Sequence, residues 1–148
     1  MKISAFLSAC VTAAFLPIAA ATAQMPVLPL SAGIHLIRAE VAYTFDTRMK
    51  GLMFRESLGP NEGMLFVFPD VQLHCMWMKN TPTPLSVAFI DENSVIVSIS
   101  DMQPHSETSH CAAAPARFAL EMNRGWFVQK GIKAGAKIRG LDKAPAPR

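Results

Sequence analysis

From residue 34 onward, the apolar residues of this chain gather into short runs, each closed by residues that favour turns. Residues 64–68 end at Pro69, and the runs at 85–90 and 95–99 are joined by the sequence Asp-Glu-Asn-Ser. Apolar runs of about four to eight residues between turn signals are typical of strands, whereas helices usually need about ten or more. The pattern therefore predicts a domain of short strands, with residues 85–99 as its clearest hairpin.

The other segments complete the same prediction. Thr44 or Asp46 can cap a short helix that reaches Leu52, and residues 123–130 can form a second helix. Many short strands with one or two short helices predict a mainly β fold (α+β by strict count), either a compact antiparallel β-sandwich or an open barrel. Further strands are expected at 34–43 (irregular near Ala39), 73–78, 117–122 and 136–141, and a polar surface loop at 103–115.

The start of the chain has the features of an export signal. Lys2 gives it a positive start, residues 3–20 are largely apolar, and Ala-Thr-Ala at 21–23 is a small-x-small cleavage site. A retained membrane anchor is the alternative, but Pro17 falls inside a run of marginal spanning length. We therefore predict a periplasmic or secreted protein without a membrane span after cleavage. Its expected parts are a signal peptide at 1–23, a flexible extension at 24–33, one globular domain at 34–141 and a flexible tail at 142–148.

Charge limits the classes of partner. Lys2 leaves with the signal, so the formal net charge falls from +3 for the 148-residue chain to +2. The positive residues form no cluster, which argues against nucleic-acid binding. The sequence also contains no glycine-rich loop that would cradle a phosphate, so we predict no cofactor. An unknown small molecule or an envelope component is the expected partner.

Two cysteines, Cys75 and Cys111, remain after Cys10 is removed with the signal. An even cysteine count in an exported protein favours a disulfide. Each cysteine follows a histidine, so a zinc site of two His-Cys pairs is the alternative. Adjacent residues of a strand point to opposite faces, which makes it hard for His74 and Cys75 to bind one ion. A disulfide is the preferred prediction.

Strand alternation also places His74, Met76 and Met78 on one face. Thioether ligands suit copper(I), and a copper site in the cell envelope is a second alternative for function. The competing interpretation is that these methionines fill gaps in the core, as methionine commonly does.

Four motifs give the chain a family resemblance: RMKGLMFR at 48–55, GMLFVF at 63–68, MWMKNT at 76–81 and LEMNRGW at 120–126. In this order and spacing, over residues 34–138, they resemble domain-of-unknown-function family 192. The resemblance implies a compact, mainly β domain with no assigned activity, and the two His-Cys pairs look like a feature of exported members. Ser86 departs from the family, which commonly has Asp there, so a mechanism that needs this carboxylate is not expected. The matching residues are Arg48, Gly51, Met53, Arg55, Gly63, Met64, Phe66, Trp77, Met78, Asn80, Thr81, Asp91, Glu121 and Trp126.

A set of polar and aromatic residues within these motifs is the candidate binding site. Planar arginine donors suit carboxylate or phosphate groups, and an exposed tryptophan suits a sugar ring or another apolar face. We therefore predict a non-catalytic protein of the cell envelope that binds a small anionic or glycan-like ligand, or serves an accessory role. The candidate residues are Arg48, Arg55, Trp77, Lys79, Asn80 and Glu121.

A structural interpretation competes with this site. Glu121 lies between Leu120 and Met122, and a charge in apolar surroundings needs a partner or a wet pocket. One arginine, with Arg55 preferred over Arg48, would then form a bridge to Glu121 while Trp77 fills the core.

Catalysis is the least favoured function. The sequence holds no Gly-x-Ser-x-Gly or His-Glu-x-x-His motif. Asp91 and Glu121 could act as paired carboxylates of a hydrolase. Asp91 also suits an ordinary turn, so we lean against an enzyme.

Overall fold

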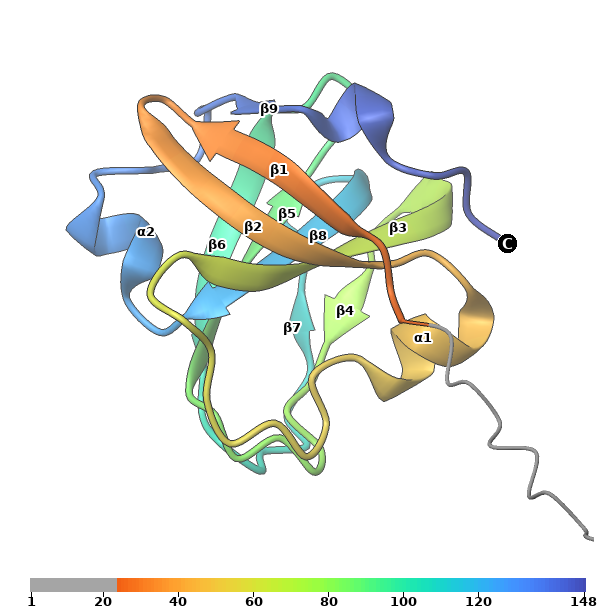
Figure 1. The fold of residues 1–148 in the computed structure, drawn as a ribbon, viewed down its shortest axis with the longest axis vertical. Helices are drawn as coiled ribbons and strands as arrows, with labels where there is room; N and C mark the ends of the chain where they lie inside the picture. The colour runs from red at the N-terminus through yellow and green to blue at the C-terminus, as the bar shows by residue number, and fades with distance from the viewer. Residues whose placement is uncertain (1–23) are drawn as a thin grey trace, which may run out of the picture.

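The structure, a computed structural model, describes residues 24–148, and the predicted signal peptide lies outside them. Within these residues, one sheet has the strand order β6-β5-β8-β3-β2-β1-β9, and β4 and β7 form a separate ribbon (Figure 1). None of the helices in this part of the chain is long and apolar enough to cross a membrane. The strands are β1 (Val27–Ala32), β2 (His35–Ala42), β3 (Glu62–Gln72), β4 (Cys75–Met76), β5 (Leu85–Ile90), β6 (Ile96–Met102), β7 (His110–Cys111), β8 (Ala116–Asn123) and β9 (Ile138–Arg139).

The seven-stranded sheet curls into a half-barrel (Figure 1). Ile138 of β9 pairs with Ala32 of β1, and the neighbouring Lys137 forms a bridge to Val95 beside β6, so the two ends of the sheet approach each other here. The mainly β prediction is confirmed, and of the two predicted architectures the open barrel is the one observed.

One pair of neighbouring strands, β2 and β3, runs parallel, and the other neighbours in the sheet are antiparallel. Parallel neighbours need a crossover connection. Here it contains helix α1 (Phe45–Lys50), which Thr44 caps by accepting a hydrogen bond from the backbone N–H of Thr47. Of the two predicted caps, Thr44 and Asp46, Thr44 is the one observed. The other helical segments are α2 (Trp126–Gln129) and a short 3₁₀ turn, η1 (Leu141–Lys143).

Strand alternation divides the buried residues between the two faces of the sheet. In β3, Leu65 and Val67 face the inside of the curl, whereas Met64 and Phe66 face outward. We call the inner cluster the barrel core; its larger members include Leu30, Ile37, Ile90, Leu120, Met122, Trp126 and Phe127. We call the other cluster the outer core; its members include Leu52, Met64, Phe66, Phe68, Met78, Val87, Phe89 and Ala119.

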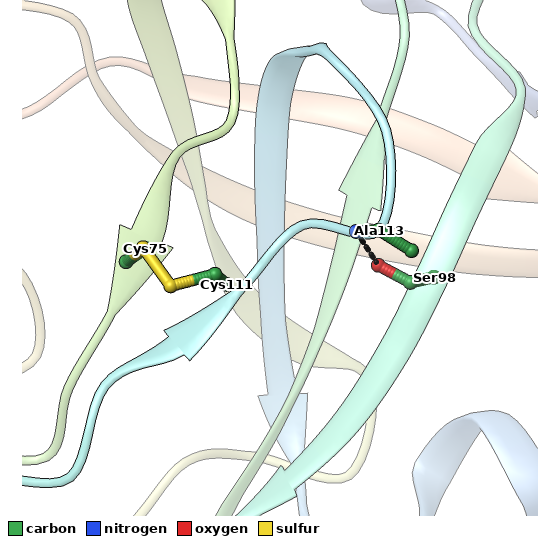
Figure 2. Close-up of a disulfide and its surroundings, with 4 residues drawn as sticks. All are labelled: Cys75, Ser98, Cys111 and Ala113. Atoms are coloured by element: carbon green, nitrogen blue, oxygen red, sulfur yellow. Dashed lines mark hydrogen bonds between the residues drawn. A yellow bond between two sulfur atoms is a disulfide. The ribbon is translucent and has the colours of Figure 1, made fainter.

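The outer core is covered by the segment around α1 and by the β4–β7 ribbon (Figure 1). A disulfide joins Cys75 of β4 to Cys111 of β7, as the sequence predicts. Just past β7, the backbone N–H of Ala113 donates a hydrogen bond to the hydroxyl of Ser98 on β6, at 3.1 Å (Figure 2). The ribbon is thus fastened to itself by a covalent bond and to the edge of the main sheet by a hydrogen bond.

Two predicted segment boundaries are wrong. The extension at 24–33 contains β1, which pairs along its whole length with β2 and buries Leu28 and Leu30. Pro29 fits there because β9 pairs only with Ser31 and Ala32, so β1 is an edge strand at Pro29. The tail at 142–148 also contacts the domain, since the N–H of its last residue donates to the carbonyl of Tyr43. Strands predicted at 73–78 and 136–141 are shorter than expected, at two residues each.

Candidate functional site

Glu121 lies near the C-terminal end of β8 on the outer face of the sheet, between Met64 of β3 and Val87 of β5. Only 3% of the residue is exposed. Burial raises the pKa of its carboxyl from 4.5 to about 8, because desolvation penalises the charged form. At pH 7 the group is therefore largely protonated and can donate a hydrogen bond.

The Glu121 carboxyl has no side-chain hydrogen bond and no ion pair with any other residue of 24–148. Among the described residues, no side-chain oxygen or nitrogen that is fully sealed from solvent lacks a partner. The oxygens of Glu121 therefore reach open space. That space is a pocket of about 290 Å³, which Glu121 lines.

The pocket is mostly apolar. Its walls come from α1 and the residues after it, from β3, and from the segment that runs through β4. The volume is close to the lower end of the range for small-molecule sites, roughly 300–1,000 Å³. The lining residues are Phe45, Arg48, Met49, Lys50, Gly51, Leu52, Met53, Phe66, Phe68, Cys75, Met76, Trp77, Lys79, Thr81 and Glu121.

Three positive side chains line the pocket together with one protonated acid. The Nη1 of Arg48 donates to the carbonyls of Tyr43, at 2.7 Å, and Val67, at 3.1 Å, which fixes α1 against β3. The Nζ of Lys79 lies 5.2 Å from the centre of the Trp77 ring, within the range of a cation–π contact. With Lys50, these groups make three positively charged side chains in the pocket lining.

Two of the predicted site residues lie elsewhere. Arg55 makes an ion pair with Glu40, in which its single Nη2 donates to both carboxylate oxygens, at 2.8 and 2.6 Å. The predicted bridge between Arg55 and Glu121 is therefore wrong. Phe54 adopts a left-handed backbone conformation (φ 65°), so the chain turns there and Arg55 is directed toward β2 instead of the pocket. Asn80 is exposed and is not part of the pocket lining, although its carbonyl accepts a hydrogen bond from the N–H of Phe54.

The core-filler interpretation of Trp77 is also wrong. Trp77 is 41% exposed and lines the pocket, while Trp126 is the buried tryptophan of the barrel core. The structure thus brings Arg48, Trp77, Lys79 and Glu121 together and separates them from Arg55 and Asn80.

The three residues predicted for copper have different surroundings. His74 stacks on Phe68 with 3.6 Å between ring centres, and Met78 is fully buried in the outer core. Only Met76 of the three lines the pocket. Oxidation of the two thiols also removes them as zinc ligands. Within residues 24–148, no three His, Cys, Asp or Glu side chains are grouped to hold a metal ion.

Asp91 and Glu121 are not brought together either. Asp91 follows Ile90, which pairs with Phe118, whereas Glu121 pairs with Val87. Four strand positions therefore separate the two acids, roughly 13 Å along the sheet. The Oδ1 of Asp91 is occupied as a turn acceptor for the backbone N–H groups of Asn93 and Val95. Paired carboxylates of a glycosidase lie within about 9.5 Å, so the predicted hydrolase pair is not present.

Ser86 lies outside the pocket. It pairs with Met122 on β8, and its neighbour Val87 belongs to the outer core, so Ser86 faces the barrel side. Its hydroxyl donates to Asp101 and accepts from the N–H of Gly125. The missing family carboxylate is therefore not a pocket group.

Several lining residues were missed by the sequence reasoning. Phe45 and Met49 lie four residues apart on α1, and this spacing puts both on one face of the helix. The available signal was that apolar spacing, but it is equally typical of a face that packs into the core. Met53 and Lys50 complete this side of the pocket.

Fold and site together define a curled β domain with an apolar, positively charged pocket on its outer face. The chain belongs to the family described as uncharacterized ACR (DUF192), whose sequence profile matches residues 28–140. The family resemblance is thereby confirmed. No curated protein matches the chain.

Two solved structures are similar to this chain over most of their lengths. A protein of unknown function from Novosphingobium aromaticivorans has 33% identity and a TM-score of 0.76, with 89% of this chain and 99% of that one covered. A protein from Sinorhizobium meliloti, described as a proposed transcription regulator, has 33% identity and a TM-score of 0.72, with 78% and 92% covered.

Proposed function

We propose that this chain is a non-catalytic domain of the cell envelope that binds a small amphiphile, with an apolar body and an anionic head, in the pocket above Glu121. The observation that carries the proposal is a buried carboxyl, without a side-chain partner among residues 24–148, at a mostly apolar pocket that positive side chains also line. Burying an ionisable group without a partner costs stability. A ligand that accepts a hydrogen bond from the protonated acid would supply the partner that the folded chain leaves out.

Charge favours an anion as the head group. Arg48, Lys50 and Lys79 line the pocket, and the acid that they accompany is mainly neutral at pH 7. A bare sugar suits the pocket less well, because the lining offers few polar groups to pair with its hydroxyls. The aromatic and methionine walls match an aryl or short alkyl body instead.

The envelope location rests on two features. A disulfide between Cys75 and Cys111 fits a protein outside the reducing cytoplasm. The export signal in the sequence supports the finer assignment to the periplasm or the secreted fraction.

The test uses 8-anilinonaphthalene-1-sulfonate, an aromatic sulfonate whose charge does not change near neutral pH. Its fluorescence should rise on binding to the exported protein and fall when octanoate displaces it. Trp77→Ala and Lys79→Gln should each weaken binding about tenfold, which corresponds to about 1.4 kcal/mol. Val128→Ala, at an exposed apolar position on α2, is the control and should bind like the wild type.

A pH series gives a sharper readout. As pH rises from 7 to 9, Glu121 ionises and its carboxylate repels the sulfonate, so wild-type affinity should fall. Glu121→Gln keeps a neutral donor and should bind equally well across this range. If the Trp77, Lys79 and Val128 variants all match the wild type, or if wild-type affinity stays constant from pH 7 to 9, the proposed ligand site is wrong.

A further inference from the structure

Helix α1 carries apolar residues but buries none of its residues. Phe45 and Met49 share one face of the helix, and both are exposed beside the pocket that they line. An apolar helix face normally packs against the protein. On α1 this face has no covering partner within residues 24–148.

Phe54 is held outward by an unusual backbone. It has φ of 65° and is 72% exposed. A bulky residue with positive φ is uncommon, and such strain persists only where the surrounding structure enforces it. Here the enforcing contact is with Asn80, also left-handed (φ 54°), whose carbonyl accepts a 2.7 Å hydrogen bond from the N–H of Phe54. The fold therefore maintains an exposed phenyl ring next to the segment that carries Trp77.

These apolar residues are interleaved with positive ones. We use the name rim for the exposed residues Phe45, Met49, Lys50, Phe54 and Trp77 together with the half-buried Lys79. Its aromatic residues are amphipathic or apolar, and lysine can lay its stem along an apolar surface while its ammonium group stays in water. Asp46 on α1 and Glu56 are acidic neighbours in sequence, but neither lines the pocket.

We propose that the rim docks on the surface of a lipid bilayer that contains anionic phospholipid. Exposed aromatic residues beside lysines are the combination that inserts at the headgroup boundary and pairs with anionic lipid. Protein interfaces are instead depleted in lysine, which argues against a protein partner. A second copy of the chain would bring two positive rims together, which charge repulsion opposes. The inference goes beyond ligand binding and does not depend on it, although docking would place the pocket mouth at the membrane.

The experiment mixes the exported protein with vesicles of phosphatidylcholine alone or of phosphatidylcholine with phosphatidylglycerol at 7:3, and sediments them. Anionic vesicles should carry down more protein, and added salt should reduce the bound fraction. Brominated lipid should quench Trp77 emission but not that of Trp126, which is buried on the other face of the sheet. No preference for anionic vesicles, or no quenching, overturns the proposal.

A pair of matched variants tests the rim itself. Phe45→Ser combined with Phe54→Ser should weaken vesicle binding about tenfold, as loss of two inserted aromatic residues would. The control, Ile34→Ser with Leu36→Ser, removes two apolar residues that are at least as exposed and lie at the start of β2, roughly 25 Å from α1. Equal losses in both variants overturn the proposal, as does a concentration-dependent dimer in sedimentation velocity without vesicle binding.

Phe54 also separates this inference from the ligand site. Phe54 lies outside the pocket lining. The single variant Phe54→Ser should therefore weaken vesicle binding and leave sulfonate binding unchanged. Loss of vesicle binding with intact sulfonate binding supports the docking surface specifically. Vesicle binding that is insensitive to Phe54→Ser and to the double variant overturns it, whatever the pocket binds.

Discussion

The two faces of the sheet are built from the same alternating strands, yet the buried polar groups on them differ in their hydrogen bonding. On the barrel side, Ser86 bonds Asp101 and Gly125, and the indole N–H of Trp126 donates to Asn61 at 3.1 Å. On the outer side, Glu121 has no side-chain partner among the residues that the structure describes. Burial alone therefore does not distinguish a structural polar group from a candidate functional one. The presence or absence of a partner does.

The two faces are also held together by different means. The barrel core is enclosed by long ladders, such as the eleven residues of β3, while the cover of the outer core includes two strands of two residues each. Those short strands are joined by the disulfide. The outer cover therefore depends on a covalent bond where the barrel depends on apolar packing.

The largest contrast should come from the two tryptophans. Trp126→Ala removes a side chain from the barrel core and should cost about 3–5 kcal/mol in the free energy of unfolding. Trp77→Ala removes a side chain that is 41% exposed and should cost about 1 kcal/mol or less. Urea denaturation monitored by circular dichroism measures both. Similar losses for the two variants would contradict the division between barrel and pocket.

Removal of the disulfide should cause the next largest loss of stability. The two cysteines are 36 residues apart in sequence, and cross-linking them should stabilise the domain by about 3–4 kcal/mol in the chain-entropy model. Urea midpoints with and without dithiothreitol measure the difference. Titration of the denatured, unreduced protein should find no free thiol in residues 24–148. Two free thiols in properly exported protein would rule the bond out.

Glu121→Gln should change stability in a pH-dependent way. The folded-state pKa of about 8 exceeds the unfolded value of 4.5, so the unfolded state loses its proton first. The contribution of Glu121 to stability is then fully present below about pH 4.5 and is lost as pH rises toward 8. The Gln variant should therefore unfold at similar urea concentration at pH 4, but be more stable than the wild type at pH 8.5 by about 1–4 kcal/mol. A variant less stable than the wild type at pH 8.5 would indicate that the ionised carboxylate is paired.

The smallest effect concerns Arg55. Its ion pair with Glu40 is partly exposed, since 41% of the Arg55 side chain and 30% of the Glu40 side chain are accessible to solvent. Solvent screening limits such pairs to about 0.2–1 kcal/mol. Arg55→Gln should lower the free energy of unfolding by that amount and leave sulfonate binding unchanged. A tenfold loss of sulfonate binding in this variant would indicate that Arg55 is part of the ligand site.

Local signals in the sequence predicted much of the fold. The cap at Thr44 and the hairpin of β5 and β6 each depend on residues close together in the chain, and both are confirmed. Strand β1 was missed because Pro29 resembles a linker residue. The proline is acceptable only because it lies at the edge of the sheet, and the sequence does not reveal which strand forms the edge.

The candidate site was harder to predict because it also depends on which segments the fold brings together. Family motifs singled out Arg48, Trp77 and Glu121, which do share the pocket, but the motifs also included Arg55 and Asn80, which do not line it. The partner of Arg55 is Glu40, a residue that no motif contained. Which charges meet is decided by the turn at Phe54 and by sheet register, and neither is visible in residue types.

The parallel pairing of β2 and β3 has a consequence for engineering the domain. A hairpin needs only a short loop, but parallel neighbours require a long return path across the sheet. In this chain that path holds α1 and the residues after it, which form one wall of the pocket. Deleting the wall would thus leave too little chain for β3 to reach its place beside β2. A pocketless version of this domain must be made by exchanging side chains, with the length of the connection preserved.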